Sequence, residues 1–131
     1  MTRQDIKNVL YLEDDVDIQT VAQIALEAMG GFTLVACSSG KEAIGAVMSG
    51  FCPDLLLFDV MLPEMDGPTT LDNLRQLPST SNTPVIFMTA KVQASEVAYY
   101  KSLGAIGVIA KPFDPMMLAS QVEDIWQAEE Q

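Results

Sequence analysis

The stretch Asp54-Leu55-Leu56-Leu57-Phe58-Asp59 places four consecutive apolar residues between two carboxylates. A second stretch, Val9-Leu10-Tyr11-Leu12-Glu13-Asp14-Asp15, is similar, since a run of apolar residues is followed by acidic residues. Apolar runs without alternation are typical of strands in parallel sheets, whose two faces are both covered by helices. If the two runs are neighbouring parallel strands, their carboxylates meet at one edge of the sheet. They would repel one another there unless a cation lay among them.

Length and charge limit what such a site can belong to. A chain of 131 residues with 49% hydrophobic residues makes one domain, expected to span 1–131, and it can bury a sizeable core. Eighteen acidic against seven basic side chains leave a formal net charge of −11, which would repel a nucleic-acid backbone. No signal peptide is recognisable, and no apolar run approaches the roughly 20 residues that cross a bilayer. We therefore expect a soluble cytoplasmic protein that binds neither nucleic acid nor membrane.

The cysteine and histidine content narrows the chemistry further. Cys37 and Cys52 are too few for a disulfide framework, so we expect two reduced thiols. Histidine is absent, and with it the commonest general base, metal ligand and phosphoryl carrier.

Strand and helix signals alternate five times along the chain. Strands are expected at 8–12, 33–37, 55–59, 85–88 and 106–110. The first helix is expected at 16–29, and the second should begin with the Ser39 capping box and end at Gly50. The third should start at Pro68, the fourth should be capped by Ser95, and the fifth should be capped and started by Asp114-Pro115. The first two helices should bury the stripes Ile18, Val21, Ala22, Ala25, Leu26 and Met29, and Ala43, Ile44, Val47 and Met48, with Gly30 ending the first. Right-handed crossovers then give an α/β fold with a doubly wound five-stranded parallel sheet.

In such sheets, sites form outside the carboxyl ends of the strands. The polar residues at those ends are Glu13, Asp14 and Asp15 after the first strand, Asp59 at the third, Thr89 after the fourth and Lys111 after the fifth. Carboxylates are the hard oxygen ligands that Mg²⁺ prefers, and a carboxylate can also act as a nucleophile toward phosphorus. Asp59 is the candidate nucleophile. Lys111 and Thr89 could donate to phosphoryl oxygens, and Pro112 after Lys111 is compatible with a cis bond.

These residues match a known family. The set Glu13-Asp14, Asp59 with Pro63 and Gly67 after it, Met88-Thr89-Ala90, and Lys111-Pro112-Phe113 resembles the receiver domains of two-component response regulators. The resemblance implies a CheY-like, flavodoxin-like three-layer sandwich with strand order 2-1-3-4-5. It also implies that Asp59 accepts a phosphoryl group from a histidine kinase or histidine phosphotransfer protein. A histidine in this chain is not needed for that transfer.

The resemblance also assigns roles to the remaining site residues. Asp14, Asp59 and the backbone carbonyl of Met61 would bind Mg²⁺ directly, with Glu13 acting through water. Thr89 and Lys111 would contact the phosphoryl group. The usual output is a rearranged surface of helix four, strand five and helix five, which can also serve for homodimers. The domain is then a signalling switch, with only a limited phosphotransfer and autophosphatase activity of its own.

One position departs from the family pattern. Many receivers carry Tyr or Phe three residues before the lysine, and that aromatic turns inward with the threonine; this chain has Val108. Tyr99 and Tyr100 on helix four could contribute to coupling, although one packed and one exposed ring is the simpler interpretation. Met61 offers no side-chain group that could orient an attacking water, which suggests slow self-dephosphorylation.

Three other interpretations can be compared with the same residues. A haloacid-dehalogenase-like phosphatase needs a second Asp two residues after the nucleophile, where this chain has Met61. A flavodoxin-like flavin binder would be repelled by the acids after the first strand. A pseudo-receiver, a protein-interaction module that never takes phosphate, usually lacks one of the site residues, and here none is missing. The downstream partner stays open, as does the place of the chain in a longer regulator or hybrid kinase.

Overall fold

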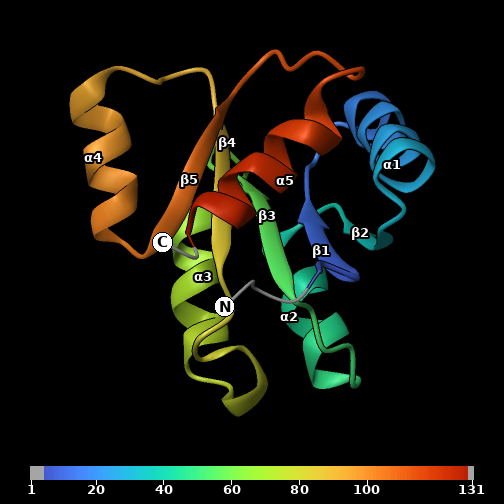
Figure 1. Ribbon diagram of the computed structural model, residues 1–131. Coiled ribbons are helices and arrows are strands. Elements are labelled where there is room, and N and C mark those ends of the chain that lie inside the picture. The colour runs from blue at the N-terminus through green and yellow to red at the C-terminus, as the bar shows by residue number, and fades with distance from the viewer. Residues whose placement is uncertain (1–4, 130–131) are drawn as a thin grey trace.

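The computed structural model describes residues 5–129 and has the expected three-layer α/β architecture (Figure 1). Its parallel strands are β1 (Asn8–Leu12), β2 (Thr33–Cys37), β3 (Leu55–Asp59), β4 (Val85–Thr89) and β5 (Ala105–Ala110). Its helices are α1 (Val16–Gly30), α2 (Gly40–Met48), α3 (Gly67–Arg75), α4 (Ala94–Ser102) and α5 (Leu118–Ala128), with a short 3-10 turn at Pro78–Thr80. The sheet order is β2-β1-β3-β4-β5, which confirms the predicted fold class.

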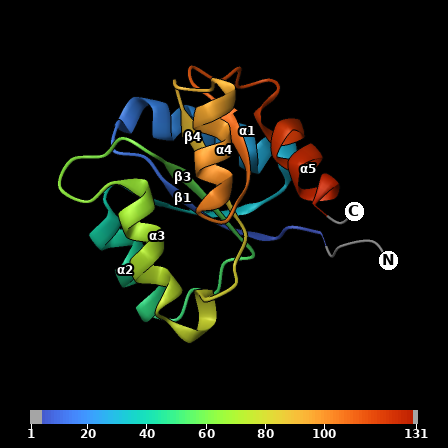
Figure 2. The same cartoon turned by 90° about the vertical axis from the view of Figure 1, so that its left-hand side faces the viewer.

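Each face of the sheet is covered by its own set of helices. Leu55 and Leu57 on β3 belong to the core under α1 and α5, whereas Leu56 and Phe58 belong to the core under α2, α3 and α4. Because successive side chains of a strand point to opposite faces, an apolar run without alternation fills both cores. All residues of β3 and β4 are accordingly buried. Figure 2 shows the two helical layers on either side of the central strands.

Helix caps follow the sequence signals, with small shifts. Asp15 caps α1 as expected, and its side chain accepts hydrogen bonds from the backbone N–H groups of Asp17 and Ile18. The prediction that Gly30 is the C-cap of α1 was wrong by one residue, because Gly30 is the last helical residue and Gly31 is the cap. Gly31 adopts the left-handed conformation, with φ of 71°, that a glycine C-cap needs.

Three further boundaries differ from expectation. In α3, Pro68 is the second residue rather than the first, because the Asp66 carboxylate caps the helix one residue earlier. In α4, Gln93 takes the capping place predicted for Ser95, through reciprocal bonds with Glu96. The Asp114-Pro115 segment forms a separate turn, in which Asp114 Oδ1 accepts from the Met116 N–H, and α5 begins only at Leu118.

The buried helix stripes are narrower than predicted. Ala22, Ala25 and Leu26 of α1 are buried, whereas Val21 and Met29 are 44% and 51% exposed, and Met48 of α2 is 73% exposed. The buried face of α1 thus covers a smaller arc of the helix than its apolar residues span. None of the helices within residues 5–129 is long and apolar enough to cross a membrane.

Candidate functional site

The side chains predicted from the strand ends gather in one place. Glu13, Asp14, Asp59, Met61, Thr89 and Lys111 all line an open depression of about 350 Å³ at the carboxyl edge of the sheet. The parallel register explains this convergence, because Leu12 pairs with Phe58 and Asp59 pairs with Met88. Each of these strands therefore delivers its next residues to the same edge.

Three of the carboxylates that line the depression form a cluster. Glu13 and Asp59 are buried, with 1% and 5% of their surface exposed, whereas Asp14 is exposed. One carboxylate oxygen from each residue lies within 4.8 Å of the others. Opposite ligands of an octahedral Mg²⁺ are about 4.2 Å apart, given metal–oxygen distances near 2.1 Å. The donor set and its span therefore fit a magnesium ion after small adjustments, or with one carboxylate acting through water.

Lys111 lies between the two buried carboxylates. Its Nζ is 2.8 Å from Glu13 Oε1 and 2.9 Å from Asp59 Oδ2. The Lys111 N–H donates to the Thr89 carbonyl at 2.9 Å, which holds the base of the side chain. The Lys111–Pro112 peptide bond is cis. Burial alone would lower the pKa of Lys111, but the hydrogen bonds and charges of Glu13 and Asp59 outweigh it, so the pKa is raised. The lysine is thus fixed as a cation.

The pKa of Glu13 is raised, and burial is the main cause. The charge of Asp59 raises it further, while the hydrogen bond from Lys111 opposes both effects. Within the cluster of Glu13, Asp14 and Asp59, three carboxylates against one ammonium leave a formal excess of two negative charges. A divalent cation would balance that charge, which is a second reason why Mg²⁺ suits these residues.

Thr89 lines the depression, and Gly67 supports the loop that follows Asp59. Thr89 is buried, and its Oγ1 accepts a hydrogen bond from the Lys91 N–H at 3.1 Å. Accepting that bond leaves the hydroxyl hydrogen to be donated to another oxygen. Gly67 packs against the end of β3 so closely that a Cβ on it would collide with the backbone oxygen of Asp59. Its N–H donates to the Val60 carbonyl at 3.0 Å, which closes the loop after Asp59.

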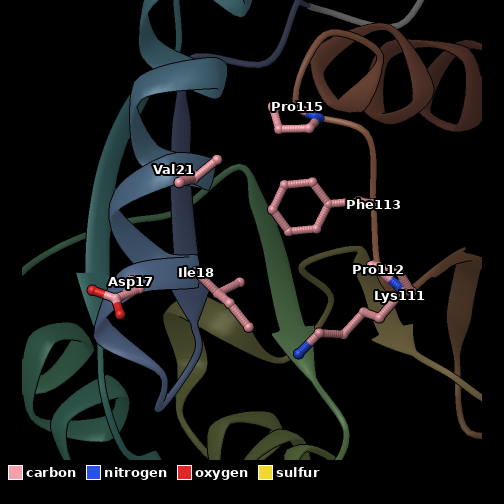
Figure 3. A pocket seen from close by; sticks show the side chains of 7 residues that line it. All are labelled: Asp17, Ile18, Val21, Lys111, Pro112, Phe113 and Pro115. Atoms are coloured by element: carbon pink, nitrogen blue, oxygen red, sulfur yellow. The ribbon is translucent and has the colours of Figure 1, made fainter.

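An apolar groove of about 260 Å³ adjoins the depression and shares Lys111 with it. Figure 3 shows Ile18 and Val21 of α1 facing Phe113 across this groove, with Pro115 at its far end. The groove was not predicted, because Val21 was expected to be buried against the sheet.

Comparison with known proteins identifies the family. The family described as "Response regulator receiver domain" matches residues 9–123 of the chain. The chain belongs to this family. The recognition made from the motifs is thereby confirmed, and the protein is a receiver domain of a two-component system.

Relatives of this receiver domain occur in different contexts. "Response regulator SaeR" of Staphylococcus aureus (strain USA300) is 29% identical over 118 residues, which cover 90% of this chain and 50% of SaeR. The chain thus spans about half the length of the curated relatives it matches. The signal receiver domain of a signal transduction histidine kinase from Syntrophus aciditrophicus is 29% identical, with a TM-score of 0.76 over 95% of this chain and 93% of that one. Chemotaxis protein CheY4 of Vibrio cholerae, 23% identical, shares the fold with a TM-score of 0.82 over 92% and 98% of the two chains.

Two residues near the site of this receiver domain were missed by sequence reasoning. Gln19 donates from Nε2 to the Glu13 carbonyl at 3.0 Å and so ties α1 to the acidic loop. Tyr11 is fully buried two residues before Glu13, and its hydroxyl has no hydrogen-bond partner within the described residues. The pKa of Tyr11 is raised, first by burial and then by the charges of Glu13, Asp59 and Asp15. Neither residue stands out in a pattern of charges and apolar periodicity.

Proposed function

We propose that Asp59 accepts a phosphoryl group from the phosphohistidine of a histidine kinase or histidine phosphotransfer protein, in a Mg²⁺-dependent reaction that switches partner binding. The observation that carries this proposal is the position of Asp59. It is a buried carboxylate at the end of β3, with Lys111 at 2.9 Å and two further carboxylates beside it. Burying carboxylates costs free energy, and buried acids beside a charged partner in an open depression are typical of functional sites.

Glu13, Asp14, Asp59 and the backbone carbonyl of Met61 would hold the magnesium ion. When bound, the ion neutralises negative charge as phosphoryl oxygens approach a carboxylate. The residues of the chain provide the nucleophile and its surroundings. In the transfer, an oxygen of Asp59 forms a bond to phosphorus while the bond from phosphorus to the donor's imidazole nitrogen breaks. The electron pair of the broken bond stays on the imidazole.

Lys111 and Thr89 stabilise the product in this proposal. The Lys111 ammonium can turn from the Asp59 carboxylate to the new phosphoryl oxygens, and the Thr89 hydroxyl can donate to them. Hydrolysis of the acyl phosphate needs a positioned water, and the Met61 side chain, 70% exposed at the rim, has no group to orient one. We therefore expect slow autophosphatase activity.

The apolar groove beside Lys111 is a surface that a phosphodonor would cover. A donor must bring its imidazole to Asp59. The groove formed by Ile18, Val21 and Phe113 adjoins the depression that contains Asp59, so a donor bound there would also cover the groove. Burial of this apolar surface would exclude water from the reacting groups.

The test is phosphorylation of the protein by a small phosphodonor in the presence of Mg²⁺, followed by intact-mass analysis. We expect one acid-stable, base-labile phosphoryl group on the wild type and none on Asp59→Asn. Asp54→Asn, directly before the first residue of β3, is the matched control and should be modified like the wild type. Phosphoserine or phosphothreonine would contradict the assignment. A protein that takes up no phosphoryl group would instead be a pseudo-receiver acting through interactions alone.

The remaining proposals concern the setting of the domain. An extent of 1–131 as one receiver domain, a cytoplasmic location and homodimers through the face of α4, β5 and α5 stay predictions. The phosphatase alternative is not favoured, because the position two residues after Asp59 carries an exposed methionine and no acid.

A further inference from the structure

Helix α4 is attached to the sheet by very few side chains. Of its nine residues only Tyr100 is buried, with 8% of its surface exposed. Glu96 and Val97 are half-buried, and the rest of the helix faces outward. Figures 1 and 2 show α4 at the outer side of the molecule beside β5. Elements with few buried contacts belong to the least stable part of a fold, so the packing of α4 against the sheet depends mainly on Tyr100.

The ring of Tyr100 rests on a strand that leads directly to the candidate site. Its centroid is 5.5 Å from that of Phe87, with the two planes at 53°. Phe87 is fully buried on β4 and lies two residues before Thr89, so both side chains belong to the same face of the sheet. The neighbour of Phe87 on β5 is Val108, which carries no ring at the position where many receivers have one.

The aromatic contacts continue from Tyr100 to the surface. Tyr99 is 57% exposed, and its ring centroid is 5.5 Å from that of Tyr100 at an interplanar angle of 60°. Phe87, Tyr100 and Tyr99 therefore form a continuous series of rings from the strand that ends in Thr89 to the outside of α4. Tilted aromatic pairs at this separation are attractive beyond their buried area.

We propose that Tyr100 is the positioning residue that couples the Asp59 site to the outer face of α4 in this chain. The inference rests on the proposed phosphorylation of Asp59. A phosphoryl group that draws Thr89 inward moves the end of β4 and the loop 90–93 that leads into α4. The Tyr100 ring then repacks on Phe87, and Tyr99 moves with the helix. A static anchor, in contrast, would stabilise α4 without responding to the site.

The chain contains three tyrosines, which makes fluorine NMR of 3-fluorotyrosine-labelled protein a direct test. Tyr11, two residues before Glu13, reports occupation of the site; Tyr99 and Tyr100 report the state of α4. Single Tyr→Phe substitutions assign the three signals. Beryllofluoride with Mg²⁺ serves as the phosphoryl mimic. We expect all three signals of the wild type to shift when the mimic is added.

Two substitutions of Tyr100 separate coupling from simple anchoring. Tyr100→Phe keeps the ring and should preserve the shift of Tyr99. Tyr100→Leu keeps a large apolar side chain without a ring, and it should lose the Tyr99 shift while Tyr11 still responds. Leu103→Ala, next to α4, is the control and should behave like the wild type. Amide shifts of residues 94–98 give a second readout that does not depend on the ring of Tyr100, and urea denaturation checks that each variant folds.

Each result decides the inference. A Tyr99 shift and amide shifts that persist unchanged in Tyr100→Leu would overturn the role of Tyr100 and leave the proposed function intact. The same conclusion holds if Tyr11 shifts in the wild type while Tyr99 stays fixed. If neither Tyr11 nor Tyr99 shifts in the wild type, the proposed function and the coupling both fail.

Discussion

Replacing Lys111 with methionine should lower the stability of the fold and raise its affinity for Mg²⁺. The lysine Nζ contacts Glu13 at 2.8 Å and Asp59 at 2.9 Å, and it is the only cation in contact with these carboxylates among the described residues. Methionine keeps most of the length of the side chain and removes the charge. A general loss of packing would lower the stability without raising the affinity for Mg²⁺, so the combination of both effects is specific to the removed charge.

The magnitude follows from burial. Removing one partner of a buried ion pair costs about 3–5 kcal/mol, because a charge is left uncompensated in the protein. The Lys111 side chain is 19% exposed, so water moderates the loss, and we expect about 2–3 kcal/mol at neutral pH. For a domain of this size that corresponds to roughly 10 °C in the melting temperature.

The loss should depend on pH in one direction. The pKa of Glu13 is already raised by burial, and the contact from Lys111 is one of the factors that hold it down. Without the lysine the pKa rises further in the folded state. An acid whose folded pKa is raised stabilises the fold when protonated and loses that contribution as the pH rises through the folded pKa. The difference in the free energy of unfolding between Lys111→Met and the wild type should therefore become smaller as the pH falls toward the ordinary glutamate pKa of about 4.3.

Binding of Mg²⁺ should restore most of the stability that Lys111→Met loses. In the wild type a bound ion competes with the Lys111 ammonium for Glu13 and Asp59, whereas the variant presents three carboxylates without a competing cation. We expect the affinity for Mg²⁺ to rise by about tenfold, a change of about 1.4 kcal/mol. The measurements are urea denaturation with EDTA or saturating Mg²⁺, and calorimetric titration of the ion. Lys91→Met, which replaces an exposed lysine in the loop between β4 and α4, is the control. Equal Mg²⁺ affinity in variant and wild type would refute the reasoning.

Three further substitutions and one labelling experiment should give clear results. Titration should show Mg²⁺ binding that is saturable in the wild type and much weaker in Asp14→Ala; equal binding would argue against the metal site. Gly67→Ala should cost about 1–3 kcal/mol, because its Cβ meets the main chain at the end of β3. Gly45→Ala, with open space around its Cβ inside α2, should stabilise by about 0.5–1 kcal/mol in the same denaturation assay. A thiol reagent followed by mass spectrometry should label exposed Cys52 and spare Cys37, whose pKa burial raises to about 11; rapid double labelling would contradict this.

The fold could be predicted because its decisive signals are short-range. Leu55 to Phe58 is too short and too uniformly apolar for a surface helix, and strands covered on both faces imply a parallel sheet. The convergence of Asp59, Thr89 and Lys111 then needed no side-chain detail, because parallel strands bring their carboxyl ends to one edge.

What the sequence could not provide was the direction of individual side chains. The bridging position of the Lys111 ammonium depends on the rotamer and on strand register, and neither leaves a pattern in the sequence. The unpaired hydroxyl of Tyr11 is another example, since an aromatic in an apolar run predicts burial and says nothing of its partners. The packing of Tyr100 on Phe87 joins residues of different elements, and only the fold brings them together.

The helix periodicity failed in an informative place. Val21 and Met29 of α1, both expected in the core, are 44% and 51% exposed, and Val21 lines the groove that reaches Lys111. Local rules of folding usually fail at functional positions, because such residues serve something other than the core. Exposed apolar side chains that continue from a groove into a charged site form a surface suited to partner binding. Val21, which the helix periodicity assigned to the core, thus lies in the groove beside which the proposed phosphodonor would approach Asp59.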